Sequence, residues 1–203
     1  MQIICIFGAS TTWGACDLEK AGWANRLTMS LASKSDYDIE IYNLGVSGNT
    51  TNDLLERFNA EAKARHPSLI IFSIGDNDSV YIASKKTQDV PIEQFESNLQ
   101  ELVKRAKKFT DKIVFLGGKK VDESQTTPIP WLTDYHYTNE NIILYDKKIK
   151  EVAEKNNVFY LRMFDLLDIK NDLDDGLHPN AQGHQKMFER VKDFLEKNKL
   201  VEK

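Results

Sequence analysis

Short, nearly continuous apolar runs alternate along the chain with longer segments in which apolar residues recur every three or four positions. A short apolar run suits a strand buried on both faces, whereas the longer spacing is that of one helical face. The short runs predict strands at 2–7, 39–43, 69–74, 112–116 and 158–161. The longer segments predict helices at 23–31, 52–64, 91–108, 139–156 and 181–198.

The order of strand and helix repeats from the first strand to the last helix. Because the strands hold few polar residues, both faces of their sheet are expected to be covered, as in parallel sheets. Right-handed crossovers then give an α/β fold, a three-layer α/β/α sandwich around a five-stranded parallel sheet. No repeat, linker or low-complexity segment interrupts the pattern, so we expect a single domain over residues 1–203.

Three of the predicted helices have features that a structure can test. Asn52 or Thr51 is expected to cap helix 52–64, and Pro67 to end it. The inner face of helix 91–108 is expected to hold Phe95, Leu99, Leu102 and Val103. Helix 139–156 offers Ile142, Ile143, Tyr145, Ile149 and Val152 for packing.

Polar residues gather directly after the predicted strands. Ser10 follows the first strand, segment 43–49 the second and segment 75–78 the third. After the last two strands come Trp131, Tyr135, His136 and Tyr137, and then Asp165, Asp175 and His178. Ligand sites of open parallel sheets form outside the carboxyl ends of the strands, so all these residues are expected at one edge.

The composition narrows the function classes. Hydrophobic residues make up 41% and charged residues 29% of 203 residues, as in an ordinary globular chain. A net charge of -4 and a pI of about 5.6 argue against a broad basic face for nucleic acid. No apolar run could span a membrane, and the chain begins with a strand rather than a secretory leader, so we expect a cytoplasmic protein. Cys5 and Cys16 indicate no disulfide framework, and the oligomeric state is unknown at this level.

The segment Asp175-Gly176-Leu177-His178 places a carboxylate three residues before an imidazole. Such a carboxylate fixes the tautomer of the ring and supports its charge when it takes a proton. The pair calls for a nucleophile, and Ser10 after the first strand offers one. For the oxyanion formed by attack on an acyl carbon, Gly48 offers a backbone N–H and Asn77 a side-chain amide.

Each of these residues also has a purely structural interpretation. Ser10 suits a helix cap or a turn, Gly48 a turn, and Asn77 a turn after a strand. Asp78 is expected to brace its loop rather than to catalyse a reaction.

The other histidines also have purely structural interpretations. A metal site of His178 and His184 straddles a helix start and fits no zinc-ligand spacing. His184 is therefore expected on a helix face or behind the site, and His66 at an exposed helix end. His136 is a candidate substrate contact.

The ordered set Ser10, Gly48, Asn77 and His178 resembles the four signature residues of the SGNH (GDSL-type) hydrolase family. The resemblance covers essentially the whole chain and implies a flavodoxin-like sheet topology. It implies that Ser10 is the nucleophile and His178 the base, with Asp175 as its partner in the Asp-x-x-His-Pro form typical of the family. The N–H groups of Ser10 and Gly48, with the Asn77 amide, would then form the oxyanion hole.

The same resemblance implies the reaction and the substrate class. It implies a Ser-His-Asp acyl-enzyme mechanism acting on small-molecule carboxylic esters, either short acyl or acetyl esters, among them acetylated carbohydrates. This mechanism needs no metal and no organic cofactor. One departure is visible: the family usually has Gly-Asp-Ser where this chain has Gly8-Ala9-Ser10. Ala9 removes a polar group that would brace the nucleophile loop, which bears on rate and subfamily.

Two other functions stay open. Ser10-Thr11-Thr12 after the first strand also suits a flavodoxin-like module that holds the phosphate of FMN, although this leaves Asn77 and the Asp175–His178 pair unexplained. A catalytically degenerate protein would keep the fold and bind acylated ligands without turnover. An ordinary α/β-hydrolase is disfavoured, because no Gly-x-Ser-x-Gly elbow follows any strand.

The segment 119–137 is long for a strand-to-helix connection and carries two prolines and several aromatic residues. Long loops of this kind are often lids or walls of binding sites. The same features suit an elaborated surface loop packed on the sheet edge. Beside a site, its rings would line an acyl pocket or stack on a sugar.

Overall fold

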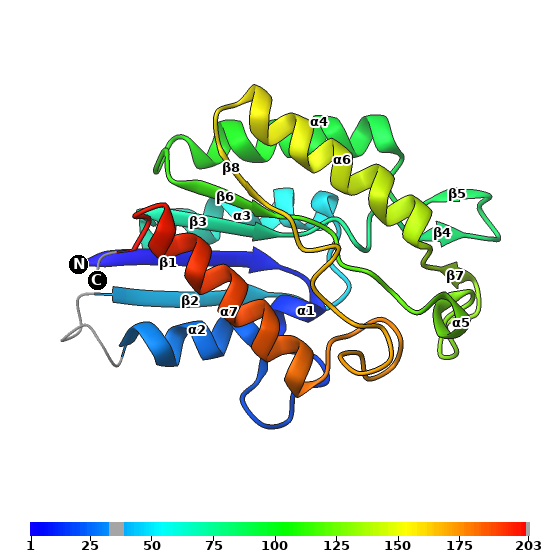
Figure 1. Ribbon diagram of the computed structural model, residues 1–203. Helices are drawn as coiled ribbons and strands as arrows, with labels where there is room; N and C mark the ends of the chain where they lie inside the picture. Colours follow the sequence, from blue (N-terminus) through cyan, green and yellow to red (C-terminus); the bar gives the residue numbers. More distant parts are fainter. Residues whose placement is uncertain (33–38, 202–203) are drawn as a thin grey trace.

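The computed structural model describes residues 1–32 and 39–201 (Figure 1). The main sheet has the strand order β2-β1-β3-β6-β8, and every pairing in it is parallel. Its strands are β1 (Gln2–Gly8), β2 (Ile39–Gly45), β3 (Leu69–Ser73), β6 (Ile113–Leu116) and β8 (Phe159–Leu161). The long helices are α2 (Gly22–Ala32), α3 (Thr51–Arg65), α4 (Ile92–Ala106), α6 (Asn139–Lys155) and α7 (Ala181–Lys197).

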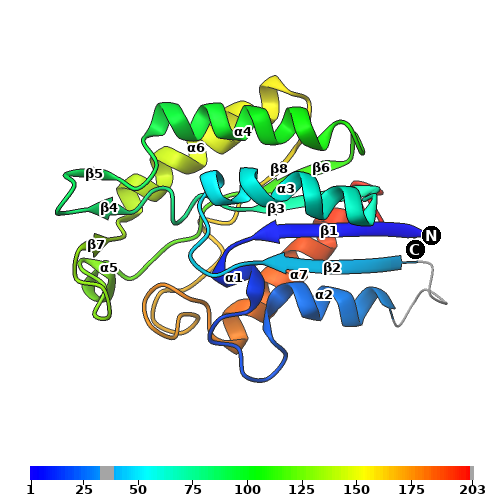
Figure 2. The ribbon, with the colours of Figure 1, turned by 180° about the vertical axis from the view of Figure 1, so that it is seen from behind.

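The helices form two layers on opposite faces of this sheet (Figures 1 and 2). Cys5 and Phe7 of β1 join a core cluster with α3, α4 and α6, whereas Ile4 and Ile6 join a second cluster with α2 and α7. Successive side chains of a strand point to opposite faces, so one apolar strand supplies both cores. The predicted three-layer sandwich with a five-stranded parallel sheet is confirmed.

Each predicted strand and helix is present, and no end differs from its predicted position by more than two residues. The cap predicted for α3 was wrong by at least one position. Thr50 is the cap, and its backbone N–H donates to the Asp53 carboxylate at 2.8 Å. The helix ends at Arg65, where exposed His66 takes a left-handed conformation before Pro67.

Helix packing follows the predicted faces with one exception. Phe95, Leu99, Leu102 and Val103 of α4 are buried, as are Ile142, Tyr145, Ile149 and Val152 of α6. Ile143 is 51% exposed, because a step of one helical residue turns it away from the face shared by the other four.

Short elements occupy the edge where the parallel strands end. They are α1 (Ser10–Trp13), α5 (Glu123–Thr126) and a small antiparallel sheet of β4 (Tyr81–Ile82), β5 (Thr87–Gln88) and β7 (Tyr135–His136). Figure 1 shows them at the end of the molecule to which the β1 and β2 arrowheads point, opposite the two termini. Among the described residues, no helix combines the length and apolarity needed to cross a membrane.

A buried polar tether joins the loop after α1 to the start of α7. The Asp17 carboxylate pairs with Arg26 and accepts the Gly22 N–H at 2.9 Å, while Arg26 reaches the Ala181 carbonyl at 3.2 Å. His184 lies beside this tether with 0% exposure. The role behind the site expected for His184 agrees with this position.

The ring of His184 is bonded at both nitrogens. Nδ1 accepts the Trp23 N–H at 3.2 Å, and Nε2 lies 2.9 Å from the Ala15 carbonyl, to which it donates. This arrangement needs a neutral ring, and burial lowers the pKa of His184 to about 4.

The buried neutral imidazole of His184 makes stability depend on pH. The unfolded chain binds more protons than the folded chain between the ordinary histidine value of 6.5 and about 4. Over that window the free energy of unfolding should therefore fall as the pH falls, by about 3 kcal/mol from this group. Urea unfolding of the wild type and of His184→Gln from pH 7 to pH 4 isolates the contribution as a difference in slope. Parallel pH profiles for the two proteins would contradict it.

Candidate active site

A hydrogen-bond chain joins the end of β1 to the loop between β8 and α7. The Ser10 Oγ lies 2.9 Å from the His178 Nε2, and the His178 Nδ1 lies 2.7 Å from the Asp175 Oδ2. Ser10 is the first residue of α1, whereas Asp175 and His178 come from a loop about 165 positions later in the chain. The structure thus brings together the three residues that the sequence singled out as a triad.

The local fold of Asp175 sets the direction of this chain. Its Oδ1 accepts the backbone N–H groups of Leu177 at 2.9 Å and His178 at 2.7 Å, which leaves Oδ2 for the ring. Burial acts to raise the pKa of Asp175, but the hydrogen bonds from His178 outweigh it and lower the pKa to about 2. Because a carboxylate only accepts, Nδ1 of the ring carries the proton and Nε2 keeps its lone pair toward Ser10.

Asn77, after β3, is held by both ends of its amide. Its Nδ2 donates to the Asn49 carbonyl at 2.9 Å, and its Oδ1 accepts the Tyr137 hydroxyl at 3.0 Å. An amide nitrogen carries two N–H bonds, so one donor remains after the contact with Asn49. Tyr137, which is 5% exposed, therefore fixes which way the Asn77 amide points.

Gly48 lies in the loop after β2, next to the residue that Asn77 contacts. Its φ of 81° is in the left-handed region, where a side chain is strained, while an added Cβ would meet nothing within 4 Å. The glycine is thus required by backbone conformation and not by crowding. Gly48 is not among the residues that line the cavity beside Ser10.

Asp78 ties the loop after β3 to the first residue of α3. It is fully buried and accepts the backbone N–H of Thr51 at 2.9 Å and the Thr51 hydroxyl at 2.5 Å. Burial raises its pKa to about 7 in spite of these hydrogen bonds. The contacts match the bracing role expected from the sequence.

The nucleophile loop is supported without any polar group at position 9. The Ala9 carbonyl accepts the N–H groups of Thr12 and Trp13, and the Gly8 carbonyl accepts the Val46 N–H at 3.0 Å. Arg57 also donates to the Gly8 carbonyl at 3.2 Å and to the Asn49 side chain at 2.7 Å. Arg57 therefore links the Ser10 loop to the Gly48 loop and supports the Ser10 loop although Ala9 stands where the family usually has an aspartate.

A cavity of about 30 Å³ opens beside the triad. Its lining includes the polar side chains of Ser10, Asn77 and His178 and the apolar side chains of Leu116 and Met187. A polar wall is made by Lys119, whose Nζ lies 2.8 Å from an Asp76 carboxylate oxygen. A water molecule needs about 10–15 Å³ by the same measure, so the space suits a group of two or three heavy atoms.

Besides Tyr137 and Lys119, the long loop 119–137 brings the exposed ring of Trp131 to the site. Trp131 is 56% exposed, and its ring stands 6.4 Å from that of His178 with an interplanar angle of 23°. Tyr135 packs in an apolar cluster beneath, and His136 meets Tyr81 edge-on. His136 does not line the cavity, so the substrate contact considered for it gains no support.

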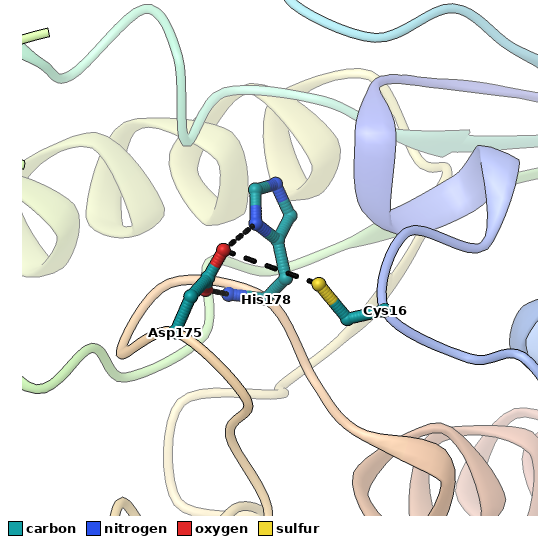
Figure 3. A group of neighbouring side chains, drawn as sticks. All are labelled: Cys16, Asp175 and His178. Carbon is teal, nitrogen blue, oxygen red and sulfur yellow. Dashed lines mark hydrogen bonds and ion pairs between the residues drawn. The ribbon is translucent and has the colours of Figure 1, made fainter. Parts of the chain in front are cut away.

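In the part of the chain that the structure describes, one group of three metal-ligating side chains occurs. It consists of Cys16, Asp175 and His178, whose ligand atoms lie within 4.8 Å of one another (Figure 3). The pairing of His178 with His184 is not formed, because both nitrogens of His184 are already bonded.

Comparison with known proteins decides the family. A family model described as the GDSL-like lipase/acylhydrolase family matches residues 6–186. The chain belongs to this family. Members of the GDSL-like family hydrolyse carboxylic esters, and the protein is accordingly a carboxylic ester hydrolase, as the sequence predicted. This outcome favours the hydrolase over the FMN-binding module.

Relatives of known sequence are distant. The chain is 24% identical to the uncharacterized protein YpmR of Bacillus subtilis (strain 168), over 98% of this chain and 83% of that protein. It is 25% identical to an acetylxylan esterase of Geobacillus stearothermophilus, over 61% of this chain and 53% of that protein.

Solved structures of similarly low sequence identity share the fold. A lipase/acylhydrolase from Enterococcus faecalis has a TM-score of 0.79 at 19% identity, covering 98% of this chain and 97% of that one. A catalytic mutant of an acetylxylan esterase from Geobacillus stearothermophilus has a TM-score of 0.75 at 19% identity, covering 96% and 93%.

The contact between Tyr137 and Asn77 predicts a positioning role in this GDSL-like hydrolase. Tyr137→Phe removes one of the two contacts that hold the Asn77 amide. If Asn77 is the oxyanion donor expected from the sequence, kcat should fall about tenfold with little change in KM, because the remaining contact with Asn49 orients the amide less firmly. Loss of the whole donor would cost more, on the order of 100-fold. Steady-state kinetics on p-nitrophenyl acetate measure this effect, and thermal melting checks that the fold is intact. Tyr135→Phe in the same loop is the matched control, and equal kinetics in the two variants would rule the role out.

Proposed function

We propose that the protein is a serine esterase that cleaves short-chain acyl esters, with acetylated carbohydrates as the favoured class, through an acyl-enzyme on Ser10. The observation that carries this proposal is the continuous hydrogen-bond chain from Ser10 through His178 to Asp175. A serine hydroxyl is a poor nucleophile until a base takes its proton. His178 supplies that base, with the lone pair of its Nε2 directed toward the Ser10 hydroxyl.

The acylation half of the reaction follows from this geometry. The Ser10 Oγ attacks the acyl carbon while the His178 Nε2 takes the hydroxyl proton, and the Asp175 carboxylate supports the imidazolium that forms. The carbonyl oxygen becomes an oxyanion, for which the N–H groups of Ser10 and Gly48 and the free N–H of Asn77 are the donors. His178 then returns its proton to the alcohol oxygen as the ester C–O bond breaks.

Deacylation repeats the same steps with water. His178 takes a proton from water, the resulting hydroxide attacks the acyl carbon, and the proton goes back to the Ser10 Oγ as the carboxylic acid leaves. The side chains described here hold and move every proton that this cycle requires.

Two features favour a small acyl group on a sugar. The cavity of about 30 Å³ beside Ser10 accommodates the methyl of an acetyl group but not a long chain. On the open side, Trp131 presents an exposed ring beside His178, the kind of platform on which a sugar ring packs. The acetylxylan esterases among the similar proteins act on such substrates by name, which agrees with this choice.

The size of the cavity predicts a preference for short acyl chains. On p-nitrophenyl acetate, butyrate and octanoate, kcat/KM should fall about tenfold or more from acetate to butyrate, because extra methylenes forced into so small a space typically cost about 1–3 kcal/mol. Activity should vanish in Ser10→Ala on all three esters. A kcat/KM that rises with chain length would contradict the short-acyl assignment, and undiminished hydrolysis in Ser10→Ala would remove the nucleophile.

The exposed ring of Trp131 predicts selective loss of sugar binding. Trp131→Ala should raise KM for acetylated xylo-oligosaccharides about 3- to 10-fold, the worth of one aromatic contact, while kcat/KM on p-nitrophenyl acetate stays within about twofold. Trp13→Ala is the matched control, since Trp13 is also exposed but lies in α1 and lines a different hollow. Equal effects of the two substitutions on both substrates would exclude a sugar platform at Trp131.

A further inference from the structure

Cys16 lies beside Asp175 and His178, with its sulfur pointing toward them (Figure 3). Its Sγ is 4.0 Å from the Asp175 Oδ2, the same oxygen that accepts from the ring of His178 at 2.7 Å. All three residues are partly buried, so a small ion from solvent can reach them. No step of the ester hydrolysis described above uses this thiol.

The position of the thiol is fixed from both sides along the chain. The carbonyl of Ala15 is bonded to the buried ring of His184, and the carboxylate of Asp17 pairs with buried Arg26. Cys16 itself has a φ of 64°, which turns the chain between these two anchors. A ligand held in place before binding loses less entropy when it takes up an ion.

The charges around Cys16 favour a cation over thiol oxidation. Burial, with the carboxylates of Asp175 and Asp174, raises the pKa of the Cys16 thiol to about 12. The reactive form in oxidation and alkylation is the thiolate, which this setting disfavours. A soft divalent cation removes that barrier, because it deprotonates a thiol as it binds.

We propose that Cys16, Asp175 and His178 form an inhibitory site for a thiophilic divalent cation of the Zn²⁺ or Cd²⁺ type. Tetrahedral zinc with bonds of about 2.3 Å to sulfur and about 2.0 Å to nitrogen and oxygen sets its ligands about 3.3–3.5 Å apart. The present separations of 2.7 Å and 4.0 Å bracket these values. A shift of about half an ångström by the Asp175 oxygen, away from the ring and toward the thiol, brings these two separations to the tetrahedral values. The Cys16 Sγ and the His178 ring nitrogen, which lie within 4.8 Å of each other, must also draw together to about 3.5 Å.

The bound ion would block catalysis by changing the tautomer of His178. The metal takes the lone pair of Nδ1, so the ring keeps its one proton on Nε2 instead. Nε2 then presents an N–H to the Ser10 Oγ, 2.9 Å away, and cannot accept the hydroxyl proton. Binding releases one proton to solvent, from the Cys16 thiol. The Asp175 carboxylate then coordinates the metal and no longer accepts a hydrogen bond from the ring. The metal site stands on geometry alone, whereas its inhibitory effect rests on the proposed function.

Titration with Zn²⁺ and Cd²⁺ tests the proposal on the full chain. Hydrolysis of p-nitrophenyl acetate should fall to background, recover with EDTA and be unaffected by Mg²⁺, which avoids thiolate. Cys16→Ser should keep the basal kcat/KM and raise the inhibitory zinc concentration by roughly 10- to 100-fold or more. That is the loss in affinity seen when a residue that merely supports a metal ligand is removed, and Cys16 would be a ligand itself. Equal inhibition of Cys16→Ser and wild type would overturn the site, since the ion would then bind without the thiol.

An optical measurement separates this site from the proposed function. Cd²⁺ should produce an ultraviolet thiolate-to-metal absorption band in the wild type and in Ser10→Ala, which keeps all three ligands. The band should be absent in Cys16→Ser, where buried Cys5 remains as an internal control. A band in a wild type that hydrolyses no ester would leave the metal site standing and defeat the esterase proposal. Absence of the band would overturn the metal site, and a band without inhibition would overturn the change of tautomer.

Discussion

The parallel pairing of β1 between β2 and β3 is the constraint on which the site depends. Gly8 pairs with Gly45 on one side and with Ser73 on the other, so three strands end level at one edge. Because the strands run parallel and end together, each loop at that edge starts from a fixed point, and Ser10, Gly48 and Asn77 all lie within four residues of a strand end. The loops that carry Ser10, Gly48 and Asn77 therefore meet in space although they are far apart in the sequence.

Each group at this edge is then held by a side chain from elsewhere in the chain. Arg57 ties the Ser10 loop to the Gly48 loop, Tyr137 aims the Asn77 amide, and Asp78 holds the start of α3. On the other side, buried His184 anchors the loop after α1 to α7. Donors fixed in this way need no reorganisation as charge develops, which is the condition for electrostatic catalysis. The same rigidity holds the Cys16 thiol beside the Asp175 carboxylate, so the triad and the proposed inhibitory site share one support.

Periodicity predicted the sandwich because the long helices and buried strands each repeat a pattern over many residues. Motif order predicted the residues that meet at the edge, since the carboxyl ends of parallel strands converge. Elements of two to four residues, such as α1 and the β4–β5–β7 sheet, carry too little pattern to be seen. The contacts of Tyr137 with Asn77 and of Arg57 with Gly8 span 60 and 49 positions, and no local signal marks them. The α3 cap was misplaced because several polar residues in a row compete for that position. The reciprocal hydrogen bonds of Thr50 with Asp53, and those of Thr51 with the distant Asp78, decide between them.

The central claim is that His178 activates Ser10 as the nucleophile. A fluorophosphonate probe reacts with such a serine and mimics the first covalent step, and peptide mass spectrometry locates the adduct. The account predicts one adduct per chain, on Ser10, and strongly slowed labelling in His178→Asn. An adduct at another residue, or no labelling of the folded wild type, would contradict it.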